Sequence, residues 1–248
     1  MRFLVPVAEP APQPTPQAPG AASSRPEFYD FDLFRAGEDH PERDETGLDK
    51  LAFTVFDTET TGLSPSEDEI ISIGAVRVVN GRLLRHETFD QLVDPGRPVS
   101  PISAKLTGIA AELLAGQPPI ETVLPAFARF CGDTVLVGHD VGFDLRFLAL
   151  KEERTGVRLS QPVLDTLLLD AALQPEQEDH SLEAIAARLG VSVIGRHTAL
   201  GDAILTAEIF LRQLRLLAAQ ELVTLGRARR AARSTYLARL SEARYSRA

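Results

Sequence analysis

The order of apolar and polar residues predicts a sheet in the first half of the chain. Residues 51–57 are apolar on both faces apart from Thr54, which predicts a buried strand. Two further apolar runs, 70–79 and 83–93, flank Asn80–Gly81, a dipeptide typical of a tight hairpin turn. Later in the chain, 134–138 reads as a short strand and 162–166 as a strand or a loop.

Helical spacing of apolar residues dominates after Pro95. It predicts helices over 123–131, 142–154 and 181–190, the last ended by Gly190, and a long helix from Gly201 to about Gln220. Antiparallel strands followed by strands alternating with helices predict an α/β fold. We therefore expect a mixed five-stranded sheet flanked by helices. This order of strands and helices along the chain matches the ribonuclease-H-like architecture.

The two ends of the chain differ from this central part, 51–220. Residues 1–25 are rich in Pro, Ala, Gln and Ser and are expected to form a disordered linker, which an upstream domain could precede. Residues 26–50 begin with clustered aromatic residues and are expected to form an arm that docks on the main domain or on a partner.

The C-terminal residues 221–248 are expected to form a basic helical tail. Its apolar residues recur at intervals of three, four or seven, which favours a packing helix. These residues are Leu222, Leu225, Ala232, Tyr236 and Leu240. The seven arginines of the tail leave open the alternative that it grips nucleic acid.

Composition excludes several classes of protein. The chain of 248 residues is 44% hydrophobic and 25% charged, as in ordinary globular domains, and no apolar run reaches the length of a membrane span. Cys131 is the one cysteine, so neither an intramolecular disulfide nor a cysteine-based zinc cluster can form, and a packed core thiol is favoured. With no secretory signal pattern, we expect a cytoplasmic protein without membrane contacts.

The net charge of −9 argues against a protein that coats nucleic acid. Residues 1–50 carry −5, residues 221–248 carry +5, and the central part carries −9. Phosphate affinity scales with the number of Lys and Arg contacts. An enzyme that engages only a strand end needs few of them.

Candidate chemistry first occurs at the end of the first strand. Asp57 and Glu59 are two residues apart, so on an extended chain both carboxylates project to the same face and can reach one cation. Alone, such a pair favours the simpler interpretation of a solvated strand end. The small residues that follow, Thr60 to Gly62, strengthen the functional interpretation because they let backbone approach a ligand closely.

Two further segments carry chemistry-bearing residues. Asp144 lies in the first turn of the helix that follows strand 134–138, where a favourable helix-dipole position is the alternative explanation. His139 could simply be a hydrogen-bonded strand end, and Phe143 could be partly core. Farther on, His197 and Asp202 are five residues apart with Gly201 between, which favours His197 on a loop and Asp202 in the opening turn of a helix.

Together these segments resemble the Exo I, Exo II and Exo III motifs of the DEDDh (DnaQ-like) exonuclease family. The segments are FDTETTGL (56–63), GHDVGFDLRFL (138–148) and HTALGDA (197–203). The resemblance implies that Asp57, Glu59 and Asp202 hold one divalent ion, that Asp57 and Asp144 hold a second, and that His197 is the general base. It also implies that Thr60, Thr61, Gly62, Leu63, His139 and Phe143 receive the terminal nucleotide. Asp140 departs from the family, which usually has Asn there, and this puts that substrate contact in question.

The chemistry agrees with the resemblance. Four converging carboxylates make sense chiefly as a cation site, and two Mg²⁺ or Mn²⁺ ions can clamp the attacking and leaving oxygens of a phosphodiester. A histidine titrates near neutral pH and suits proton abstraction from water. We expect a 3′→5′ exonuclease that acts on single-stranded ends, DNA favoured over RNA, with a DNA polymerase as a further candidate partner. The alternative is a catalytically silent docking module of the same fold.

Overall fold

The computed structural model describes residues 41–193, 195 and 197–245. The linker expected at 1–25 and the aromatic part of the expected arm lie outside these residues. None of the helices in the described part has the length and apolar character needed to cross a membrane.

A five-stranded mixed sheet forms the centre of the fold, in the order β3-β2-β1-β4-β5. The strands are β1 (Ala52–Thr60), β2 (Ile70–Val79), β3 (Arg82–Leu92), β4 (Val135–Gly138) and β5 (Val163–Asp165). β1, β2 and β3 pair antiparallel, whereas β4 runs parallel to β1 and β5 parallel to β4. The predicted α/β fold with a mixed five-stranded sheet is therefore confirmed.

The predicted hairpin turn is also present. Asn80 has a φ of 52° and Gly81 a φ of 66°, so both central residues are in the left-handed region that a two-residue turn of this kind requires. β1 is longer than predicted and runs to Thr60, because it stays paired with β2 beyond Asp57. The first two acidic residues therefore lie inside a strand, and their common face is fixed by the sheet.

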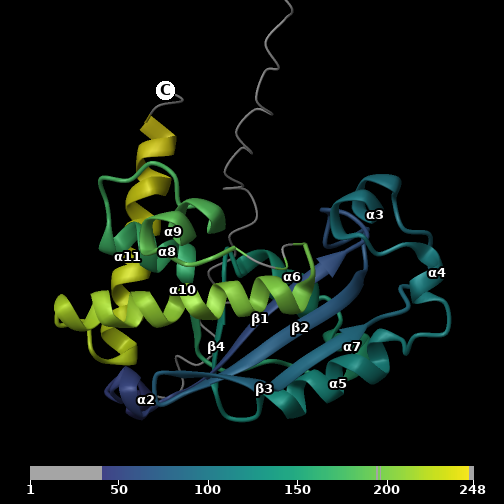
Figure 1. Ribbon diagram of the computed structural model, residues 1–248, viewed down its shortest axis with the longest axis horizontal. Coiled ribbons are helices and arrows are strands. Elements are labelled where there is room, and N and C mark those ends of the chain that lie inside the picture. Colours follow the sequence, from purple (N-terminus) through teal and green to yellow (C-terminus); the bar gives the residue numbers. More distant parts are fainter. Residues whose placement is uncertain (1–40, 194, 196, 246–248) are drawn as a thin grey trace, which may run out of the picture.

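Helices cover both faces of the sheet (Figure 1). On one face, apolar side chains of α8, α10 and α11 pack on Phe53 and Val55; on the other, those of α5 and α6 pack on Phe56. α3 and α4 lie near the end toward which β1 points (Figure 1). The bounds are α3 (Pro101–Thr107), α4 (Ala111–Leu114), α5 (Ile120–Cys131), α6 (Gly142–Ala149), α7 (Glu152–Thr155), α8 (Thr166–Leu173), α9 (Leu182–Leu189), α10 (Ala199–Ala219) and α11 (Leu225–Tyr245).

The helical predictions need two corrections. The single helix expected over 142–154 is divided into α6 and α7, because the chain turns at Lys151 and buries its ammonium group 2.8 Å from the Glu69 carboxylate. The second correction concerns α8, which was not predicted. Its sequence, TLLLDAAL, is apolar on nearly every side because most of it is buried, so no amphipathic stripe marks it as a helix.

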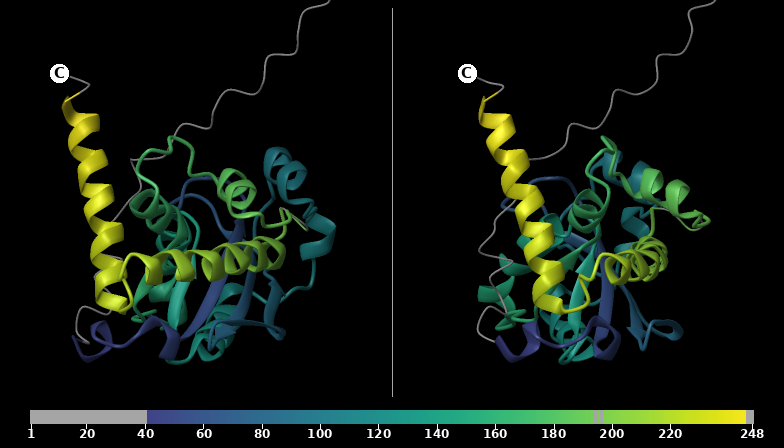
Figure 2. Two further views of the ribbon diagram at one scale, coloured as in Figure 1. Left: turned by 60° about the vertical axis from the view of Figure 1, so that its left-hand side comes forward. Right: turned by 90° about the vertical axis from the view of Figure 1, so that its left-hand side faces the viewer.

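Segments from both sides of 51–220 contribute to the same core. Leu48, in a short 3₁₀ turn (Leu48–Lys50), and Leu225, at the start of α11, are buried in one cluster. The Arg229 guanidinium lies 3.2 Å from the Asp44 carboxylate of α2 (Pro41–Asp44), and α11 packs along α8 before it runs out beyond the rest of the body (Figure 2). The first part of the basic tail is thus a packing helix.

Candidate active site

Three carboxylates from two distant segments meet at one point. Asp57 and Glu59 project from the same face of β1, and Asp202 comes from the first turn of α10, which crosses that face. Each residue offers one oxygen, and these three oxygens lie within 4.8 Å of one another. Hard cations such as Mg²⁺ and Ca²⁺ prefer oxygen ligands, so this donor set fits a divalent ion.

The start of α10 holds His197 beside Asp202. Thr198 caps the helix by accepting the Gly201 N–H at 3.1 Å, and the helix begins at Ala199. His197 precedes the cap with a φ of 64°, and its backbone N–H donates to the Asp202 carboxylate at 3.2 Å. Its imidazole is exposed whereas Asp202 is buried. The sequence predicted this arrangement, with the histidine on a loop and the acid in the opening turn.

Asp144 reaches the same end of β1 from the opposite face. Its carboxylate accepts the Thr58 N–H at 3.0 Å and the Thr58 hydroxyl at 2.5 Å. Burial raises the pKa of Asp144 to about 7; the two Thr58 hydrogen bonds oppose this rise, and the negative charge of Glu59 adds to it. An acid held so far from its ordinary pKa gains from a nearby cation, which would stabilise the charged form.

Thr58 is a site residue that the sequence analysis missed. It lies between Asp57 and Glu59 and points to the other face of β1, where it contacts Asp144. Strand alternation would have revealed it, because a residue between two ligands must face the opposite side. One strand therefore presents two acids to α10 and a hydrogen-bond donor to α6.

The end of β1 and the loop that follows it turn two predicted substrate residues inward. Thr60 donates its hydroxyl to the Gly62 carbonyl at 2.5 Å, and Thr61 donates its hydroxyl to Asp68 at 2.9 Å. A side chain at Gly62 would collide with the Asp68 carboxylate, which would lie 2.4 Å from its Cβ. Leu63, in contrast, is 59% exposed. The loop thus packs Gly62 against Asp68 and exposes the apolar side chain of Leu63.

The β4–α6 turn places the remaining predicted contacts. His139 Nδ1 lies 3.0 Å from the Thr166 hydroxyl. The centroid of the Phe143 ring lies 4.9 Å from that of Phe147, and Phe143 is half-buried. Asp140 has a φ of 51°, in the left-handed region that Asn and Asp adopt more readily than other side chains. This backbone requirement explains why Asp can replace the usual Asn.

α3 contacts the end of β1 that carries the site and was not predicted as a functional element. The Ser103 hydroxyl donates to the Thr60 carbonyl at 2.6 Å, which fastens the helix to the end of β1. Ile102 is 81% exposed and Leu106 56% exposed. A Ser cap at Ser100 followed by Pro101 was the sequence signal for this helix.

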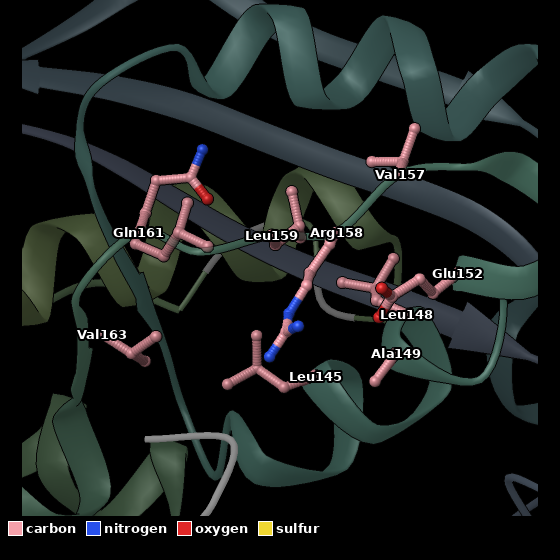
Figure 3. A pocket seen from close by; sticks show the side chains of 10 residues that line it. Leu145, Leu148, Ala149, Glu152, Val157, Arg158, Leu159, Gln161 and Val163 are labelled. Atoms are coloured by element: carbon pink, nitrogen blue, oxygen red, sulfur yellow. The ribbon is translucent and has the colours of Figure 1, made fainter. Parts of the chain in front are cut away.

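A hollow between α6 and residues 157–163 is separate from the carboxylate cluster (Figure 3). It is a cavity of about 130 Å³ lined mainly by apolar side chains of α6 and of 157–163, with Arg158 and Glu152 among them. None of the predicted site residues lines it. The carboxylate cluster, rather than this hollow, is the place where a phosphodiester could react.

A sheet of this order, with three carboxylates gathered at the end of its central strand, defines a metal-dependent nuclease of the ribonuclease-H-like class. The sequence profile of a family described as exonuclease matches residues 54–210. The chain therefore belongs to this exonuclease family, and the motifs at 56–63, 138–148 and 197–203 are those of its DEDDh members.

Similar proteins share this domain. The chain is 47% identical over 216 residues to a DNA polymerase III subunit epsilon-like protein of Rhodobacter capsulatus, covering 86% of this chain and 30% of that protein. It is 41% identical over 162 residues to the PolC-type DNA polymerase III of Caldanaerobacter subterraneus subsp. tengcongensis, covering 65% of this chain and 11% of that protein. The chain thus spans less than a third of the length of these relatives.

Solved structures agree on the fold. Exonuclease X in complex with 5′ overhanging duplex DNA superposes with a TM-score of 0.59 at 25% identity, covering 73% of this chain and 99% of that one. The nuclease domain of 3′hExo, a DEDDh family member bound to rAMP, gives a TM-score of 0.60 at 20% identity, covering 68% of this chain and 94% of that one. The second likeness shows a shared fold.

Proposed function

We propose that this chain is a 3′→5′ exonuclease that hydrolyses phosphodiester bonds at the 3′ end of single-stranded DNA, in preference to RNA, and releases nucleoside monophosphates. The observation that carries the proposal is the meeting of Asp57, Glu59 and Asp202 within 4.8 Å at the end of β1. Three acids in so small a space would repel one another without a cation. All five positions of the DEDDh set are intact, which favours an enzyme over a silent docking module.

Each acid has a role in metal binding under this proposal. Asp57, Glu59 and Asp202 hold one divalent ion, and Asp57 with Asp144 holds a second. When bound, two Mg²⁺ or Mn²⁺ ions supply the positive charge that stabilises the attacking and leaving oxygens. The Thr58 bonds to Asp144 keep one of its oxygens engaged by the protein, so the carboxylate is held in a fixed orientation.

His197 is the general base. It lies on an exposed loop, so water can reach its imidazole, and its backbone N–H is bonded to Asp202 at 3.2 Å. That bond couples the position of the base to the position of a metal ligand. Proton removal from water by a positioned histidine contributes about 10²–10⁴-fold to the rate of such reactions.

The terminal nucleotide binds against the rim formed by Gly62, Leu63, His139 and Phe143. An exposed leucine and a half-buried aromatic ring offer apolar contact and stacking, which tolerate any base because every base has a flat face. Thr60 and Thr61 support the rim from within, since their hydroxyls bond inside the loop. A rim that contacts the base through apolar and aromatic side chains suits an enzyme that removes nucleotides irrespective of sequence.

The preference for DNA and the biological setting rest on the relatives. Two of them are named for DNA polymerase III, and Exonuclease X was solved with duplex DNA carrying a 5′ overhang. We infer a role in replication or repair in the cytoplasm, with a DNA polymerase or an additional domain as partner.

The test uses single strands of DNA and of RNA, each labelled at the 5′ or the 3′ end. With Mg²⁺ or Mn²⁺, the 3′ label should leave at once as a mononucleotide, while the 5′-labelled strand shortens through a ladder, faster for DNA. EDTA and Asp57→Ala should abolish both signals, whereas Glu153→Gln, an exposed acid on α7, should not. Immediate release of the 5′ label, or full activity of Asp57→Ala, would overturn the proposal.

A further inference from the structure

The turn between β4 and α6 is held by a buried carboxylate from the neighbouring strand. Asp165, which is 1% exposed, ends β5. Its carboxylate accepts the backbone N–H groups of Asp140 at 3.1 Å, Val141 at 3.1 Å and Leu167 at 2.8 Å. Asp165 therefore caps α8 and binds the turn at the same time.

The backbone of this turn is shaped to receive an anion. Asp140 is left-handed and Val141 is right-handed helical, with φ −63° and ψ −13°. Consecutive N–H groups in such a conformation point into one concavity, which binds a negative group. Here the Asp165 carboxylate fills it. Because α6 begins at the next residue and carries Asp144 in its first turn, the turn sets where Asp144 lies.

The next residue, Thr166, contacts the His139 ring at the nitrogen that distinguishes its two neutral tautomers. Thr166 is fully buried, and its hydroxyl donates to the Gly138 carbonyl at 3.2 Å. The Gly138 carbonyl can only accept, so the hydroxyl bonds both partners at once only by donating to Gly138 and accepting from His139 Nδ1, which lies 3.0 Å away. Neutral His139 must then carry its proton on Nδ1, and Nε2 has a lone pair that can accept a hydrogen bond.

We propose that Asp165 and Thr166 are positioning residues of the exonuclease site: Asp165 orients α6 and thereby Asp144, and Thr166 fixes the tautomer of His139. The proposal rests on the proposed function in treating Asp144 as a metal ligand and His139 as a nucleotide contact. The hydrogen-bond chain from β5 to the turn is independent of that function. The roles of Asp165 and of Thr166 can be tested separately.

Nitrogen NMR of the five histidines tests the Thr166 half without any substrate. The His139 signals are assigned as those lost in His139→Gln. In the wild-type protein, neutral His139 should be protonated at Nδ1; in Thr166→Ser this pattern should persist, and in Thr166→Val it should shift toward the Nε2-protonated form. A wild-type His139 protonated at Nε2, or a spectrum that Thr166→Val leaves unchanged, would overturn this half.

Kinetics give a second reading of Thr166. Thr166→Val should raise KM for a single strand roughly three- to tenfold, as for one lost hydrogen bond, with a smaller change in kcat. Thr166→Ser should restore KM, because it restores the hydroxyl. Equal KM values in all three proteins would contradict a role in nucleotide binding while leaving the NMR result to stand on its own.

Asp165→Asn tests the metal half. The amide nitrogen replaces one accepting oxygen, so at least one N–H of the turn loses its partner. We expect calorimetric Mn²⁺ affinity to fall about 10- to 100-fold, the usual effect of disturbing residues that orient metal ligands, and excess Mn²⁺ to restore the rate. Asp179→Asn is the control for removing an N–H acceptor before a helix, because Asp179, an exposed residue, accepts the Ser181 N–H at 2.8 Å just before α9.

The outcomes separate the two proposals. Unchanged Mn²⁺ affinity in folded Asp165→Asn, or a loss equal to that of Asp179→Asn, would refute the positioning role of Asp165. If the wild-type chain bound Mn²⁺ and lost affinity on Asp165→Asn but degraded no strand, the positioning role would survive and the proposed function would fail.

Discussion

Gly74 and Leu200 lie so close together that no side chain fits between β2 and the start of α10. A Cβ atom at Gly74 would stand 2.1 Å from the Leu200 backbone nitrogen, well inside contact distance. Gly74 is the pairing partner of Asp57 in the sheet, and Leu200 precedes Asp202 by two residues. The missing side chain thus lets the helix approach the strand at the point where the carboxylates meet.

Gly74→Ala should weaken metal binding and activity together. The added methyl must push the first turn of α10 away from the sheet, since the atoms it meets are backbone. A displacement of about 1 Å can cost roughly 10²-fold in rate, and overpacking costs about 1–3 kcal/mol of stability. Mn²⁺ calorimetry and thermal unfolding check this. A folded Gly74→Ala protein with wild-type Mn²⁺ affinity would show that the close approach is not needed.

Asp144→Asn should stabilise the metal-free protein while it abolishes activity. Burial raises the pKa of Asp144 from 3.8 to about 7, so between these values the folded protein binds a proton that the unfolded chain does not. By linkage, stability falls as pH rises through this window and stays reduced above it. Asn removes that penalty and keeps an oxygen for the Thr58 bonds.

The measurement is thermal unfolding in EDTA at pH 8 and pH 5. Asp144→Asn should melt above wild type at pH 8, and the difference should shrink at pH 5, where wild-type Asp144 is protonated. Asp90→Asn, an exposed acid on β3, should show neither effect. An Asp144→Asn protein that melts below wild type at pH 8 would contradict the pKa argument.

Sequence predicted those parts of the site that depend on local periodicity. The pairing of Asp57 with Glu59 follows from strand alternation. The placement of His197 and Asp202 follows from a helix start between them, predicted at Gly201 and found at Ala199. The hairpin turn at Asn80–Gly81 was visible for the same reason. Each of these features is determined within a few residues along the chain.

Contacts between distant segments could not be read in this way. That Thr58 binds Asp144, or that Asp165 holds the turn at Asp140, depends on which strands become neighbours. α8 was missed because burial on nearly all sides removes the amphipathic pattern. The division of 142–154 depends on the Lys151–Glu69 ion pair, which joins residues 82 positions apart in the sequence.

His197→Asn should remove the general base without disturbing the fold. His197 has a φ of 64°, and Asn adopts this left-handed conformation readily, so the backbone N–H can still donate to Asp202. The rate should fall about 10²–10⁴-fold, while Mn²⁺ affinity and melting temperature stay at wild-type values. A variant that cleaves at nearly the wild-type rate would exclude His197 as the base.

The basic face of α11 should contribute little to strand binding. Leu225, Ala228 and Ala232 anchor the helix in the core, so deleting it would test folding rather than binding. Arg227 and Arg230 are exposed, and replacing both with Ser leaves the packed face intact. If both contacted phosphates, the slope of log affinity against log salt would fall by about 1.4 on their removal, at about 0.7 per contact for single strands. We expect an unchanged slope, because the tail packs; a loss near 1.4 would instead make α11 part of the nucleic-acid interface.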